Sequence, residues 1–253
     1  MDMKGSIAAI KDAITKSTAE RTSPEVISAA YAVVYLIGGV LLASARLLGA
    51  AGPFGMAAVA ASGAGLNGVA ALIGAAIGYI ISCGLAGSIR YLAAIVLVYT
   101  ICFAFQDTKL ASKSVFAPAT AAVSALSTGI LSSFTSVFTQ APAAAVVLIE
   151  TVFSFGGCWF FREAMSGRER TTESEELRYA GSVLITAAVL LMAVSQIEIF
   201  GAISLGRLVA VLIVMTCTLR CGIMTGCTIG TAFGIAMDLT AGGMPFYTMA
   251  YAF

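Results

Sequence analysis

The sequence predicts an all-α fold: a polytopic bundle of about ten short transmembrane helices, preceded by an N-terminal amphipathic helix. Apolar residues make up 59% of the 253-residue chain, and charged residues only 11%. A soluble domain averages about 25% charged residues, which it needs to cover its surface. Apolar runs also recur along the chain from Val26 to its end. Lipid must therefore be the solvent for much of the surface.

Composition also excludes several classes of function. The chain has no histidine, which removes Ser-His triads, histidine metal sites and histidine proton relays. Its net charge of +1 argues against a nucleic-acid partner, because such proteins use clustered basic residues to displace counterions. The six cysteines form no CxxC pair and are interpreted as small buried apolar residues. We expect no catalytic residue, cofactor or metal site in this chain.

Two regions are predicted. Residues 1–25 are polar, and Ile7, Ile10 and Ile14 recur within them at helical spacing. This pattern indicates a cytoplasmic amphipathic segment, either on the membrane surface or as a solvated tail. Residues 26–253 form the transmembrane domain. Its last span opens at Met244 and is expected to be truncated at Phe253, because a membrane chain rarely ends inside the hydrocarbon.

The number of spans depends on one long apolar run. The runs are Val26–Ala45, Pro53–Cys83, Tyr91–Phe105, Val115–Phe138, Ala141–Phe161, Tyr179–Phe200, Leu208–Leu219, Gly222–Met237 and Met244–Phe253. A span needs about 20 residues, so the second run is too long for one. A break near Gly63–Gly65 makes two short helices and places 11 of the 14 Lys and Arg residues on one side. The positive-inside rule then favours ten spans with a cytoplasmic N-terminus.

Charged residues within the spans are candidate functional residues. Glu150 lies midway through its run, where a charge is costly. It forms either a buried pair with an arginine, a protonated carboxyl bonded within the bundle, or part of an ion or proton path. Arg46 is the other intramembrane charge singled out. It lies nearer a span end, as do Arg90, Arg207, Arg220 and Asp238, and side chains at such positions can snorkel to the headgroups.

Two further patterns concern contacts. Gly222, Gly226, Gly230 and Gly234 recur every fourth residue and share one helix face, which predicts close helix packing, either internal or between subunits. The charged loop Arg162–Arg178 is predicted to be cytoplasmic, either simply solvated or used for docking. It contains Arg162, Arg168 and Arg170, and then Glu175 and Glu176 in the first turn of the next helix, where the helix dipole favours acids.

Several segments together resemble one family. The run from Gly38 to Ala61, with Arg46, Pro53, Phe54 and Gly55, resembles the opening of the membrane region of the stage II sporulation protein E family. Ser174–Leu177 resembles that family's acidic helix start. The glycine-rich Gly222–Gly234 and the closing Ala250–Phe253 resemble its late spans. Ser44-Ala45 departs from the family, which has a glycine before the arginine.

The resemblance implies an architecture of ten spans, a cytoplasmic regulatory region and a PP2C-type Ser/Thr phosphatase domain. That phosphatase uses manganese or magnesium and activates a forespore sigma factor. It lies outside this chain, which has no Asp-Gly metal motif. The implied role of this chain is a membrane anchor, localisation and assembly module at the polar sporulation septum of the bacterial cell membrane. The implied partners are the lipid bilayer, a second copy, the tubulin-like cell-division protein and septal proteins.

Two other functions fit the residues. A small-solute transporter, or its membrane substrate-binding subunit, would use Glu150, the hydroxyl-rich run Val115–Phe138 and short paired helices near Gly63. A structural membrane protein without a ligand would use none of them. Uptake measured with Glu150→Gln distinguishes the transporter from the other two.

Overall fold

The structure is a computed structural model that describes residues 24–49, 51–134, 144–166, 172–199, 203–241 and 246–252. Its helices are α2 (Pro24–Ser44), α3 (Pro53–Ser62), α4 (Leu66–Ala104), α5 (Phe116–Phe134), α6 (Ala144–Met165), α7 (Glu173–Val194), α8 (Leu205–Cys221), α9 (Ile223–Ala241) and α10 (Phe246–Ala252). The predicted all-helical membrane bundle is confirmed in this part of the chain. The predicted amphipathic helix lies in residues 1–25, almost entirely outside the described residues.

Within the described residues, four helices are long and apolar enough to cross a membrane: α4, α6, α7 and α9. Large apolar side chains such as Phe134, Leu219 and Met224 are exposed on the outside of the bundle, which is typical of a lipid-facing surface. The predicted count of ten spans is not supported. One physical reason is α3, whose ten residues rise about 15 Å, half the thickness of the hydrocarbon core.

Helix α4 folds back on itself at Gly84. Glycine is permissive for the backbone found there, with φ 68° and ψ 169°. The rings of Tyr79 and Tyr91 stack with centroids 4.7 Å apart. In a straight helix, twelve residues would separate them by about 18 Å. A Cβ on Gly68 would lie 3.2 Å from the ring of Tyr99, so the two arms of α4 run antiparallel and side by side.

The turn before α4 follows the sequence prediction. Helix α3 ends at Ser62 and α4 begins at Leu66. Gly63 and Gly65 both have positive φ, at 70° and 121°, which glycine adopts at no steric cost. The predicted break near Gly63–Gly65 is therefore confirmed.

Helix α2 packs closely against the first arm of α4 through glycines. A Cβ on Gly39 would lie 2.6 Å from the carbonyl oxygen of Ala71, and one on Gly78 would lie 2.5 Å from that of Val40. One on Gly74 would collide with the carbonyl oxygen of Leu36. Small residues of this kind let helix backbones approach within a membrane, where van der Waals packing drives association.

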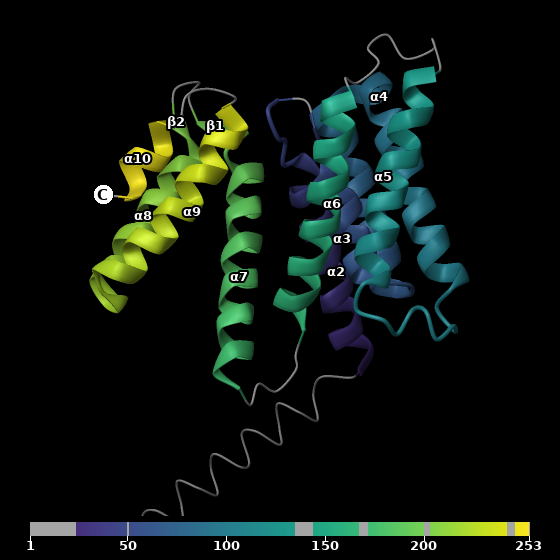
Figure 1. The fold of residues 1–253 in the computed structure, drawn as a ribbon, viewed down its shortest axis with the longest axis horizontal. Coiled ribbons are helices and arrows are strands. Elements are labelled where there is room, and N and C mark those ends of the chain that lie inside the picture. The colour runs from purple at the N-terminus through teal and green to yellow at the C-terminus, as the bar shows by residue number, and fades with distance from the viewer. Residues whose placement is uncertain are drawn as a thin grey trace, which may run out of the picture.

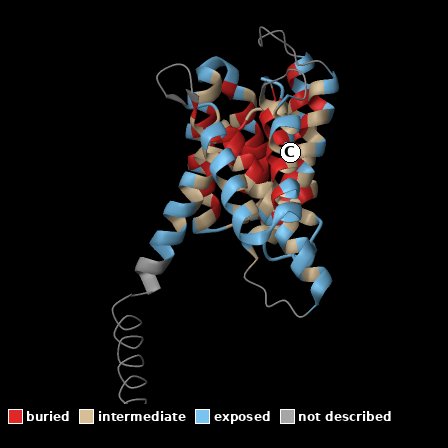
Figure 2. Ribbon diagram, turned by 90° about the vertical axis from the view of Figure 1, so that its left-hand side faces the viewer, coloured by how far each residue is buried: buried red, intermediate tan, exposed pale blue. Residues whose placement is uncertain are grey.

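The helices form two groups, as Figure 1 shows: α2 to α6 on one side and α7 to α10 on the other. Helix α7 packs against α6 and α2 in the first group and against α8 and α9 in the second. Figure 2 shows that buried residues gather within the bundle, while exposed residues cover the outer faces of the helices.

The segment after α7 differs from its prediction. The predicted run Tyr179–Phe200 stops being helical at Val194. Strands β1 (Glu198–Ile199) and β2 (Ile203–Ser204) then pair antiparallel, with Glu198 opposite Ser204. The apolar run continues beyond the helix because the hairpin also carries isoleucines, so apolarity alone cannot locate the end of the helix.

Candidate functional site

Glu150 forms a buried ion pair with Arg90. Glu150 lies on α6 and its side chain is 1% exposed, while Arg90 lies on the second arm of α4 and is 11% exposed. Nη2 of Arg90 donates to both carboxylate oxygens of Glu150, at 2.5 Å each. Of the alternatives left open by the sequence, the structure has the pair with an arginine.

The partner is an arginine that the sequence placed at a span end. A side chain at such a position can snorkel to the headgroups, but that of Arg90 pairs with Glu150. The reversal at Gly84 places Arg90 beside α6 and turns it into the bundle instead. A guanidinium held within hydrocarbon needs a counter-charge, and Glu150 supplies it.

Two tyrosines complete the surroundings of Glu150. The Tyr91 hydroxyl donates to Oε1 of Glu150 at 2.6 Å, and the guanidinium of Arg90 lies 4.6 Å from the centre of the Tyr91 ring. The hydroxyl of the buried Tyr79 donates to the carbonyl oxygen of Gly52 at 2.5 Å. It also accepts from the backbone N–H of Met56 at 3.2 Å.

The start of α3 joins the same cluster. Gly52 precedes the first residue of α3, and its N–H lies 3.4 Å from Oε1 of Glu150. A carboxylate at a helix N-terminus is also favoured by the helix dipole. A Cβ on Gly55 would lie 2.6 Å from the Tyr79 ring, too close for a side chain, and one on Gly52 would lie 3.1 Å from it, a tight contact. We call Gly52, Tyr79, Arg90, Tyr91 and Glu150 the Glu150 cluster.

The geometry of the Glu150 cluster is better suited to holding helices together than to binding and releasing an ion. The carboxylate accepts from three donor residues on two separate segments, the start of α3 and the second arm of α4, so releasing it for an ion would break contacts on both. Among the described residues, no group of three or more His, Cys, Asp or Glu side chains could hold a metal ion. One polar atom in the cluster is unused, because Nη1 of Arg90 is buried without a hydrogen-bond partner.

Arg46 lies apart from the Glu150 cluster. It is half-buried, and its Nη2 donates to the carbonyl oxygen of Ser82 while its Nη1 reaches that of Gly49 at 3.4 Å. Ser82 lies two residues before Gly84, so Arg46 binds a carbonyl at the C-terminal end of the first arm of α4. Helix C-termini favour cations through their unpaired carbonyls and the helix dipole.

We call Gly222, Gly226, Gly230 and Gly234 the glycine row. Other helices of the same chain contact three of these glycines. A Cβ on Gly226 would collide with Thr218 on α8, and one on Gly230 with the carbonyl oxygen of Tyr251 on α10. One on Gly234 would lie 2.5 Å from Cα of Thr248, also on α10. Of the two contacts predicted for these glycines, the structure therefore contains the internal one.

Gly222 departs from the predicted row. It has φ +89° and ends α8, whereas α9 begins at Ile223. An unbroken helical row of four glycines is therefore wrong at its first member. The positive φ of Gly222 interrupts the helix between α8 and α9, and a Cβ there would meet nothing within 4 Å.

Helix α10 is fastened over the glycine row by Asp238. Its two carboxylate oxygens accept from the backbone N–H groups of Tyr247 and Thr248, each at 2.8 Å. The guanidinium of Arg207 lies over the Tyr247 ring, 4.7 Å from its centre. Asp238 and Arg207 therefore each have a partner on α10.

The charged loop is described in part. Nη1 of Arg162 donates to the carbonyl oxygen of Ser114 at 3.1 Å, which joins the end of α6 to the start of α5. Glu175 and Glu176 lie in the first turn of α7, as predicted, with Thr172 in extended conformation before it. Arg168 and Arg170 lie outside the described residues.

Comparison of this chain with protein-family models, with curated proteins and with solved structures finds no match. The Glu150 cluster therefore has to be interpreted from its own geometry. The sequence singled out Glu150 but missed Tyr79 and Tyr91, since tyrosines within apolar runs look like ordinary core residues. The sequence separated the runs Pro53–Cys83 and Tyr91–Phe105, and α4 reverses between them at Gly84, but the pairing of Arg90 with Glu150 was missed.

Proposed function

We propose that this chain is a membrane anchor and localisation module, the role implied by its resemblance to the membrane region of the stage II sporulation protein E family. In this proposal it holds a cytoplasmic PP2C-type phosphatase at the polar sporulation septum. A second copy and the tubulin-like cell-division protein are its proposed partners. The ten-span topology, with the N-terminus in the cytoplasm, belongs to the same proposal.

The observation that carries the anchor role is the engagement of Glu150. The buried carboxylate of Glu150 on α6 accepts hydrogen bonds from the start of α3 and from α4, and so joins these segments rather than remaining free to bind a solute. A rigid bundle of this kind suits a scaffold that presents its cytoplasmic ends in a fixed arrangement.

The hydroxyls of α5 support the same conclusion. They were a reason to consider a polar conduit through the run Val115–Phe138. Thr120 donates to the carbonyl oxygen of Phe116, and Thr128 to that of Ser124, both within their own helix. Ser132 and Ser133 both donate to the carbonyl oxygen of Gly129. Such bonds satisfy these four hydroxyls within their own helix, whereas Oγ of Ser124 on α5 is buried without a hydrogen-bond partner.

Localisation tests the proposal directly. The chain is fused at its N-terminus to a fluorescent protein and produced in a spore-forming bacterium, with an unrelated polytopic membrane protein fused in the same way as the control. We expect the chain to gather at the polar septum while the control labels the whole membrane evenly. Even labelling by both fusions would refute the localisation role.

The transporter alternative has one structural observation in its favour. Nη1 of Arg90 is a buried donor without a partner, and an anionic solute could use it. Uptake of a panel of small anions into vesicles containing the purified chain tests this alternative. Uptake that Glu150→Gln abolishes, and that Glu163→Gln on the exposed end of α6 leaves unchanged, would favour transport over anchoring.

A further inference from the structure

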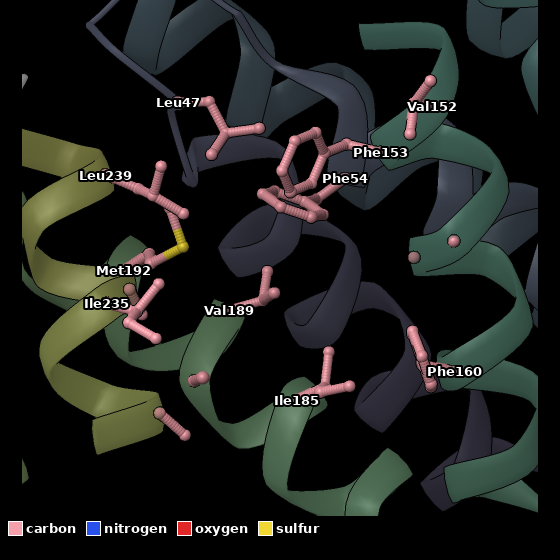
Figure 3. A pocket seen from close by; sticks show the side chains of 15 residues that line it. Leu47, Phe54, Val152, Phe153, Phe160, Ile185, Val189, Met192, Ile235 and Leu239 are labelled. Atoms are coloured by element: carbon pink, nitrogen blue, oxygen red, sulfur yellow. The ribbon is translucent and has the colours of Figure 1, made fainter. Parts of the chain in front are cut away.

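A cavity of about 400 Å³ lies between the two groups of helices. Figure 3 shows its lining, with Phe54 and Phe153 on one side and Val189 and Ile235 across from them. Side chains from α3, α6, α7 and α9 line it, together with Leu47. Every lining residue is apolar, so the cavity offers no side-chain hydrogen bond and no charge.

Small residues leave this space open. Gly156 on α6 has nothing within 4 Å of the position that a Cβ would take. Across the cavity, Ala188 on α7 and Ala232 and Ala236 on α9 present only methyl groups. Beside the lining residues Leu47 and Leu239, the N–H of Leu48 donates to the carbonyl oxygen of Leu239 and joins α9 to the loop after α2.

The mouth of the cavity faces the surroundings of the bundle. Val152 lies on its rim with 67% of its surface exposed, and Ile235 with 47%. These residues belong to α6 and α9, two of the helices that are long and apolar enough to cross a membrane. The medium at the mouth is therefore hydrocarbon in the membrane-embedded protein.

We propose that an acyl chain of a membrane lipid occupies this cavity. Water is excluded, because a buried water needs two to four polar partners and the lining has none. An empty space would forfeit dispersion contacts along its whole lining. Within lipid there is also no hydrophobic driving force that would close the gap between the helix groups.

Size and chemistry favour an acyl chain over other occupants. One turn of a helix, about 5.4 Å high and 10 Å wide, already fills roughly 400 Å³, so a helix from a second copy could insert little more than one turn. A hydrocarbon chain is thin enough to enter along its length. No charged side chain lines the cavity, so the site selects the tail and is indifferent to the headgroup.

Photolabelling of the whole chain tests the proposal. The purified protein is reconstituted in phosphatidylcholine vesicles that contain a trace of phosphatidylcholine with a diazirine in the middle of one acyl chain. After illumination, labelled residues are located by mass spectrometry. Met192 is the diagnostic residue, because it lines the cavity yet is only 2% exposed, so a lipid on the outside of the bundle cannot reach it.

Two matched variants identify the cavity as the source of the label. Gly156→Leu projects a side chain into the cavity, whereas Gly181→Leu makes the same change on α7 at a position that is equally open but outside the lining. We expect Met192 to be labelled in the original chain, labelled at least five-fold less in Gly156→Leu, and unchanged in Gly181→Leu. Ala232→Leu provides a second filling variant if Gly156→Leu does not fold.

Three results would overturn the proposal. The label could appear only on outward residues such as Val152 and never on Met192. Labelling of Met192 could be equal in the filling variants and the control. A photo-crosslink between two copies through α6 or α9 residues at the cavity mouth would make a second copy the occupant instead.

Discussion

Replacing Glu150 by glutamine removes the counter-charge of Arg90 but keeps the size of the side chain. The remaining guanidinium cannot lose its proton, and it is held within the bundle with 11% of its surface exposed. Breaking a buried ion pair by removing one partner costs about 3–5 kcal/mol. For a protein of this length, each kcal/mol lowers Tm by about 2–4 °C, so we expect a loss of roughly 6–20 °C.

Two comparison variants make this prediction specific. Glu163→Gln is the same substitution on the same helix, at an exposed pair in which Glu163 lies 3.8 Å from Arg178. Exposed pairs contribute about 0–1 kcal/mol, so its Tm should fall by at most about 4 °C. The double variant Glu150→Gln with Arg90→Met no longer buries an unpaired charge. It should recover at least about 2 kcal/mol, or about 4–8 °C, relative to Glu150→Gln alone.

The assay is thermal unfolding in detergent, followed by a dye that reacts with thiols. Cys158 is fully buried and reacts only after unfolding, whereas Cys221 and Cys227 are exposed and react before heating. The reasoning fails if Glu150→Gln and Glu163→Gln lower Tm equally. It also fails if the double variant is less stable than Glu150→Gln alone, because the unpaired charge would then not be the source of the loss.

Three further predictions concern packing, the C-terminal helix and topology. Gly39→Ala should lower Tm in the same assay, because its Cβ would lie 2.6 Å from a carbonyl oxygen of α4. The control Gly38→Ala places its Cβ in open space and should leave Tm unchanged. Equal effects of the two variants on Tm would count against the close contact of α2 with α4. Asp238→Ala removes the acceptor of the first turn of α10 and should cost about 0.5–2 kcal/mol. The loss should be seen as faster hydrogen exchange of the amides in 246–252, and unchanged exchange would show that Asp238 does not hold α10. A variant that keeps only Cys221, exposed at the end of α8, should react with a membrane-impermeant maleimide in lysed cells but not in intact ones; labelling of intact cells would reverse the proposed topology.

Apolar content and its spacing were enough to predict where most helices lie. The break near Gly63–Gly65 followed from length, because a 31-residue run exceeds what one span can hold. The start of α7 followed from Glu175 and Glu176, since acids are favoured in the first turn of a helix. Glu150 was recognisable as a buried charge because the residues on either side of it are apolar.

Only the tertiary structure decided which residues meet. The break between the runs Pro53–Cys83 and Tyr91–Phe105 predicted that the chain turns where α4 reverses at Gly84, but it did not reveal that Arg90 then meets Glu150 on α6. The glycines of α9 face α8 and α10, and Asp238 binds the backbone of α10 and holds that helix over them. The sequence by itself determined that the chain forms helices suited to lipid, since the apolar content of each run is a local property. Partner choice depends on how distant segments fold together, and no local pattern carries that information.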